Sequence, residues 1–158
     1  MKNIYLFLKG LEPDERGLTL DQIWALSDRQ INASHSFIQK VFPIDEPSTH
    51  SLNKFYIEDA GLVNQIRMDP KAVENLLISK DWFLSYLSRN DSWQCLHNHN
   101  QLRITRIIKS LLLLVSRDEA EAFYKRVHEL ITPQAKIPAR TFSYWESALG
   151  FNTKTQAS

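Results

Sequence analysis

The sequence has little of what several common classes of protein depend on. It contains a single cysteine, Cys95, so no disulfide can form within the chain and nothing calls for an oxidising compartment. Four glycines in 158 residues leave no glycine-rich phosphate loop or dinucleotide fingerprint. Nineteen basic against 18 acidic residues give a net charge of +1, which offers no bulk positive charge to nucleic acid. We therefore expect an intracellular, soluble and cytoplasmic protein that does not bind nucleic acid.

Long apolar runs are also missing. The longest uncharged apolar run is Leu111 to Val115, far below the roughly 20 residues that a membrane-spanning helix needs. The apolar run near the N-terminus, Ile4 to Leu8, is shorter than the roughly 7–15-residue core of a secretory signal. The sequence predicts no integral membrane segment.

What the sequence does contain is helical periodicity. Hydrophobic residues make up 43% of the chain, enough to bury a core in one domain. They recur at spacings of three and four, and no segment alternates with the period of a strand. We predict a single all-α domain over residues 1–150, built of six or seven helices, followed by a frayed tail over residues 151–158.

Capping and stop signals place these helices along the chain. Thr19 and Gln22 form a capping-box pattern, Pro43 ends the second helix, and Asp69 precedes a proline at a helix start. Gly150 stands where a C-terminal cap is expected. The predicted order is an irregular arm over 1–17, a short helix after Thr19, helices over 28–42, 56–67, 70–88 and 100–115, a loop over 44–53, a helix capped by Asp118, and a last helix capped by Thr141.

The helix over residues 100–115 is the one around which we expect the domain to be organised. Its apolar side chains gather on one side at 100° per residue; they are Ile104, Ile107, Ile108, Leu111, Leu114 and Val115. A polar stripe of about 60° runs along another side by the same geometry; its members are His99, Arg103, Arg106 and Ser110. A broad face for burial is thus bordered by a narrow cationic face.

Arg103 and Arg106 allow two interpretations. Two arginines on one face can hold a carboxylate or phosphate through paired hydrogen bonds. Equally, they can pair with internal carboxylates or with carbonyls at helix ends and hold helices in register. His35 and Gln39, one turn apart on the second predicted helix, either belong to the core or line a polar pocket with the stripe. The candidate ligand-binding residues are Arg103, Arg106, His99, His35 and Gln39.

Other chemistry has weaker support. Cys95, His97 and His99 alternate closely, and a fourth residue, His35, His50 or His128, could complete a Cys/His metal or enzyme site. The spacing selects none of the three, and the paired spacing of zinc ligands is absent. No serine elbow, P-loop or metalloprotease helix occurs. We therefore predict a protein that is not an enzyme and has no cofactor. A further alternative is an oligomerising or scaffold protein that uses exposed aromatics such as Tyr144 and Trp145.

Two stretches of the chain are similar to motifs of one family. His35-Ser36-Phe37-Ile38-Gln39-Lys40-Val41-Phe42-Pro43 resembles a histidine, an aromatic residue and Ile-Gln, followed after two residues by Phe-Pro. Asn100-Gln101-Leu102-Arg103-Ile104-Thr105-Arg106-Ile107-Ile108-Lys109-Ser110-Leu111 resembles Asn-x-Leu-Arg-Ile-Thr-Arg-Ile-Leu-Lys-Ser-Leu. Both motifs resemble the N-terminal conserved domain of the opioid growth factor receptor family. The likeness extends over roughly residues 5–130, and between 54 and 93 it is a similar helix pattern only.

The resemblance implies an all-helical domain with no known catalytic role. In animals this family is linked to binding the peptide called opioid growth factor, at perinuclear or nuclear locations. The chain resembles a compact version without the repeat tail. Lys40 stands where the family usually has tryptophan, so we expect a solvated surface there. Together, residues and resemblance predict a helical binding module for a peptide or small anionic ligand.

Overall fold

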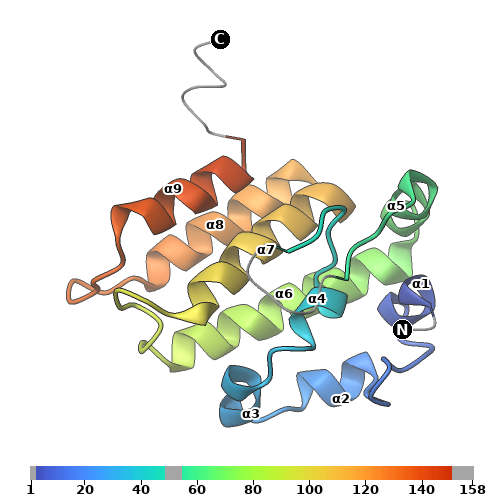
Figure 1. The fold of residues 1–158 in the computed structure, drawn as a ribbon, viewed down its shortest axis with the longest axis horizontal. Helices are drawn as coiled ribbons and strands as arrows, with labels where there is room; N and C mark the ends of the chain where they lie inside the picture. The colour runs from blue at the N-terminus through green and yellow to red at the C-terminus, as the bar shows by residue number, and fades with distance from the viewer. Residues whose placement is uncertain (1–2, 49–54, 151–158) are drawn as a thin grey trace.

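The computed structural model describes residues 3–48 and 55–150, and within them the chain is helical without a strand. The all-α prediction is therefore confirmed for the part of the chain that is described. Figure 1 shows the nine helices present in these residues. Their bounds are α1 Ile4–Leu8, α2 Leu20–Trp24, α3 Asp28–Ala33, α4 Ile38–Val41, α5 Ala60–Arg67, α6 Pro70–Arg89, α7 His99–Leu114, α8 Arg117–Leu130 and α9 Ala139–Ala148.

The long helices pack on one another, and the short ones cover their flank. α7 contacts α5, α6, α8 and α9, while α6 also contacts α1, α5 and α8 (Figure 1). The apolar face of α7 supplies Ile104, Ile107, Ile108, Leu111 and Leu114 to the core, all without exposed surface. This arrangement leaves the polar stripe of α7 to face the segment that carries α3 and α4. Of the described helices, none combines the length and apolarity needed to cross a bilayer.

Several local signals act as the sequence predicts. Thr19 accepts from the amide of Gln22, whose side chain accepts in return from the Thr19 amide, so the capping box is present. Asp69 caps α6 through the amides of Lys71 and Ala72. Gly150 follows α9 with a φ of +84°, a left-handed conformation that glycine adopts without strain.

Two predictions about helix continuity are wrong. Residues 1–17 are not wholly irregular, because Asn3 caps the short helix α1. Residues 28–42 form two short helices, α3 and α4, in place of one. α3 ends at Ser34, whose ψ of 127° is extended, and the carbonyls around this break receive hydrogen bonds from α7. Donors from another helix thus replace the bonds that a continuous helix would make internally. The helix count consequently exceeds the six or seven expected.

Other boundaries differ by a few residues. Ser116, two residues ahead of Asp118, caps α8, and α5 begins at Ala60 in place of Tyr56. Thr141 lies inside α9, where its hydroxyl donates to the side chain of Gln101 at 3.0 Å. The tail over residues 151–158 and the end of the predicted loop, residues 49–53, lie outside the described residues.

Two predictions about exposure are also wrong. Trp145 has no exposed surface and donates from its ring to the carbonyl of Gln101 at 3.1 Å. It is a core residue and cannot serve an external interface as it stands. Lys40 is only 4% exposed and is hydrogen-bonded to the carboxylate of Glu15. The expectation of a solvated surface at Lys40 is therefore wrong, because its side chain is buried in an ion pair.

Candidate functional site

The polar stripe of α7 meets the carbonyl groups of residues 31–43. His99 Nε2 lies 2.8 Å from the carbonyl oxygen of Asn32, and Ser110 donates to the carbonyl of Pro43 at 2.8 Å. Arg103 and Arg106 lie between them and donate to four more carbonyls of this segment. All four members of the stripe therefore satisfy backbone acceptors at the ends of α3 and α4 or just after them.

Arg103 holds the end of α3. Its Nη1 donates to the carbonyl of Ile31 at 2.8 Å and to the side-chain oxygen of Asn100 at 3.1 Å, and its Nη2 donates to the carbonyl of Ser34. The guanidinium also lies 5.2 Å from the centre of the Phe37 ring, within range of a cation–π contact. Arg103 is 5% exposed. These contacts support the interpretation in which Arg103 holds helices in register through carbonyls at a helix end.

Arg106 holds α4 in the same way. Its Nε donates to the carbonyl of Phe42 at 2.8 Å, and its Nη2 donates to the carbonyl of Gln39 at 3.1 Å. Nη1 makes no hydrogen bond to the described residues. Arg106 is 8% exposed, so only a small part of this residue, which still has N–H groups able to donate, is accessible to solvent.

Neither arginine forms an ion pair with a carboxylate within the described residues. Burial lowers the pKa of Arg103 to about 10, against an opposing effect of Tyr86. Burial lowers the pKa of Arg106 to about 10 as well, against the opposing charge of Glu46. Both remain protonated at neutral pH. Two nearly buried positive charges are thus compensated mainly by the dipoles of carbonyl groups, which favours an anion nearby.

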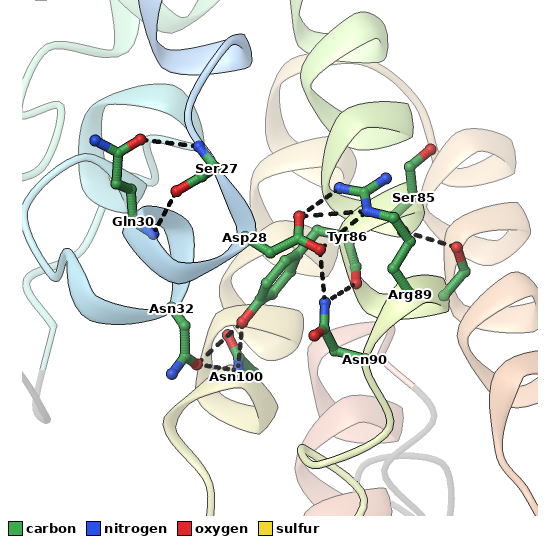
Figure 2. A network of polar contacts seen from close by, with 10 residues as sticks. Ser27, Asp28, Gln30, Asn32, Ser85, Tyr86, Arg89, Asn90 and Asn100 are labelled. Carbon is green, nitrogen blue, oxygen red and sulfur yellow. Dashed lines mark hydrogen bonds and ion pairs between the residues drawn. The ribbon is translucent and has the colours of Figure 1, made fainter.

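A second polar network fixes α3 against α6 and α7 (Figure 2). The hydroxyl of Tyr86 donates to the side-chain oxygen of Asn32 at 3.0 Å, and Asn100 donates to the same oxygen at 3.1 Å. The carboxylate of Asp28 accepts a hydrogen bond from Nη2 of Arg89 at 2.7 Å. Asn100 also accepts from Arg103, so this network and the arginine hold the end of α3 together.

A groove of about 1010 Å³ runs along this junction. All five residues predicted to bind a ligand lie in its wall: His35, Gln39, His99, Arg103 and Arg106. The structure therefore brings together residues from two distant parts of the sequence, as the polar-pocket interpretation expects. His35 is exposed, and its ring lies edge-on to His99 with 5.3 Å between centroids. The alternative that His35 is a core histidine is wrong, because α3 ends before it.

The groove is mainly apolar around its charged side. The apolar residues in its wall are Ile38, Ile44, Pro47, Leu102, Tyr144 and Ala148. Leu102 is 41% exposed and Tyr144 is 54% exposed, so two large side chains of this wall present apolar surface to solvent. Sequence reasoning missed both as site residues. Leu102 offered a signal, since it lies off the apolar face of its helix, but only the fold shows that it borders a groove.

Lys109 also lines the groove, but its charge is already paired. Its Nζ lies 2.6 Å from a carboxylate oxygen of Glu46. Glu46 is the one acidic side chain among the described residues of the groove wall. The positive charge left without a carboxylate in this wall is therefore that of Arg103 and Arg106.

Gln39 has the least usual environment in the site. Its side chain is 2% exposed, and Oε1 has no hydrogen-bond partner among the described residues. Most buried polar atoms are paired, because an unpaired one costs about 1–3 kcal/mol. The groove wall thus contains a side-chain acceptor without a donor, Oε1 of Gln39, and a guanidinium, that of Arg106, with one nitrogen not bonded to the described residues.

The alternative of a Cys/His metal site gains no support from the arrangement of the described residues. No three histidine, cysteine or acidic side chains within them come together in a way that could hold a metal ion. Cys95 donates from its sulfur to the carbonyl of His97 at 3.2 Å, and the His97 ring lies 3.3 Å from a guanidinium nitrogen of Arg140. His99, as described above, faces the carbonyl of Asn32.

Comparisons with protein-family models, with curated proteins and with solved structures found no match to this chain. The resemblance to the opioid growth factor receptor family therefore stays a prediction made from two sequence motifs. The candidate site rests on its own geometry.

Proposed function

We propose that this protein is a non-enzymatic binding module that takes a peptide or a small anionic ligand in the groove between α7 and the α3–α4 segment. One observation carries the proposal: the groove wall contains two nearly buried arginines with no carboxylate partner among the described residues. An anion in the groove would supply the missing counter-charge. The apolar wall around it would bind an attached hydrophobic group.

The two arginines have different roles in this proposal. Arg103 positions α3, since three of its N–H groups bond to acceptors of the protein. Arg106 positions α4 and also binds the ligand, because its Nη1 remains without a protein acceptor in the described structure. α7 is then the organising helix of the domain, with one face in the core and the other serving both the fold and the ligand.

The motifs of residues 35–43 and 100–111 acquire a common explanation here. Residues of both stretches line the groove, and Arg106 joins the two stretches through the carbonyls of Gln39 and Phe42. A resemblance to the opioid growth factor receptor domain in these two stretches therefore supports a shared scaffold and a binding role. We extend the proposal to a peptide ligand on that ground, without assigning the opioid peptide to this chain.

The proposal is tested with a matched pair of small probes. 4-Methylpentanoate carries a carboxylate on a branched apolar body, and 4-methylpentanamide has the same body without the charge. Titration into ¹⁵N-labelled protein, followed by NMR, should shift amide signals of residues 35–46 and 99–109 with the acid only. Equal binding of the amide, or no binding of either probe, would contradict the proposal.

A pair of surface variants locates the site. Leu102→Asp places a negative charge in the groove at an exposed position and should abolish binding of 4-methylpentanoate. Leu96→Asp makes the same change at a residue that is 58% exposed and lies outside the groove wall, so binding should persist. Circular dichroism should show the same helicity for both variants. If both bind the probe as the unaltered protein does, the ligand lies elsewhere.

A further inference from the structure

The groove places three different demands on its ligand. They come from Arg106, from the apolar wall and from Gln39, and each can be considered separately. The residues concerned lie in the wall of one groove, so a single ligand can meet all three demands.

The charge of the ligand follows from the arginines. Arg106 offers Nη1, while Arg103 is almost fully used by protein acceptors and Lys109 is paired with Glu46. A carboxylate carries a single charge in a planar group, and one of its oxygens can accept a charge-assisted hydrogen bond from Nη1. A phosphate carries up to two charges and three acceptor oxygens, and it would find too few donors here. The free donors of the wall therefore match a monocarboxylate better than a phosphate.

The body of the ligand follows from the wall. Leu102 and Tyr144 expose large apolar surfaces, and Ile38 and Ile44 extend the same wall. Covering such surface is favourable in proportion to the apolar area removed from water. A branched aliphatic or aromatic group next to the carboxylate would do this, whereas a polar acid such as citrate would not.

The third demand is a hydrogen-bond donor. Oε1 of Gln39 has no donor among the described residues, and the carbonyl of the same residue accepts from Arg106. The terminal carboxamide torsion is soft, so the group can turn toward a ligand in the groove. An ionised fatty acid has no N–H or O–H to offer it. A ligand that carries an amide N–H beside its carboxylate satisfies Gln39 and Arg106 at once.

We infer that the groove recognises an α-acylamino carboxylate with an apolar side chain, its carboxylate on Arg106, its amide N–H on Gln39 and its side chain against Leu102 and Tyr144. The inference rests on the proposed function and narrows its ligand. Two sources share this chemistry: a free N-acylated amino acid, and the last residue of a peptide with a free carboxyl end.

The test adds one group to the probe already described. N-Acetyl-leucine is 4-methylpentanoate with an acetamido group on the carbon next to the carboxylate. We expect it to bind about tenfold more tightly than 4-methylpentanoate, as is typical when a buried unpaired acceptor gains a donor. N-Acetyl-leucinamide, which lacks the negative charge, should bind at least about tenfold more weakly than N-acetyl-leucine.

A variant at Gln39 separates this inference from the proposed function. Gln39→Met keeps the length of the side chain and removes its unpaired oxygen, so the fold should persist. In this variant N-acetyl-leucine should bind no more tightly than 4-methylpentanoate, while 4-methylpentanoate binds as before. If the two acids already bind equally to the unaltered protein, the inference fails and the proposed function stands. If neither binds, both fail.

A last comparison distinguishes the two sources. The peptide Ala-Ala-Ala-Leu presents the same terminal group with a longer chain attached. Binding about tenfold or more above that of N-acetyl-leucine would assign the groove to peptide ends. Equal binding would assign it to free N-acylated amino acids. A peptide that does not bind while N-acetyl-leucine does would also assign the groove to the free compound.

Discussion

Nε of Arg106 lies 2.8 Å from the carbonyl oxygen of Phe42, the C-cap residue that follows α4. α4 is only four residues long and has no side-chain cap at its start, so it has little stability of its own. The arginine of α7 supplies the donors that the end of α4 lacks. This relationship explains why an arginine occupies a nearly buried position and why it also borders the groove.

Replacing Arg106 should therefore destabilise the fold. Arg106→Gln removes donors from the carbonyls of Gln39 and Phe42, and we expect a loss of about 3 kcal/mol, since hydrogen bonds to charged groups contribute about 1.5–3 kcal/mol each. The matched control is Lys109→Gln on the same helix. It breaks an ion pair with Glu46 that is largely open to water, and should cost no more than about 1 kcal/mol. Urea unfolding followed by circular dichroism measures both; equal losses would contradict the role of Arg106.

Tyr86 should stabilise the position of α3 through its hydroxyl. Tyr86→Phe removes the hydrogen bonds to Asn32 and Asn100 (Figure 2) and should cost about 1–2 kcal/mol, because two amide groups lose a partner in a partly buried site. Asn32→Ala should cost a similar amount. The double variant should cost less than the sum, as expected for residues of one network. Strict additivity in unfolding free energies would show that the contacts do not stabilise the fold together.

His99 should make the protein sensitive to mild acid. Burial and the positive charge of Arg103 lower its pKa from the ordinary 6.5, with a smaller effect of His35, while the carbonyl of Asn32 opposes them. The unfolded chain then binds a proton at a higher pH than the folded protein does. The contribution of His99 to the free energy of unfolding is complete above pH 6.5. This contribution is lost as the pH falls through the lowered pKa of His99 in the folded state.

This pH dependence is measurable by urea unfolding between pH 8 and pH 5, the range in which His99 changes charge. His99→Gln keeps a donor near the carbonyl of Asn32 but cannot take up a proton. The variant should lose less stability than the unaltered protein between these two pH values. A loss of the same size in both proteins would assign the acid sensitivity to other groups.

The sequence alone determined the all-helical class and most of the local stops and starts. These depend on contacts within a few residues, such as the capping box of Thr19 and Gln22 and the left-handed glycine at 150. It also marked the stripe of α7, because helical periodicity places His99, Arg103, Arg106 and Ser110 on one face whatever they contact. The grouping of His35 and Gln39 with this stripe was one of two interpretations that periodicity allowed.

Only the tertiary structure decided what the stripe does. Its partners are backbone carbonyls 64 or more residues away, and a sequence pattern does not show where a distant carbonyl will lie. The same bonds let the chain break between α3 and α4, which exposed His35 and contradicted a helix over 28–42. The groove, with Leu102 and Tyr144 in its wall, arises from packing α9 and α4 beside α7. That packing depends on contacts between residues far apart in the sequence, whereas helix formation depends on residues within a few positions of one another.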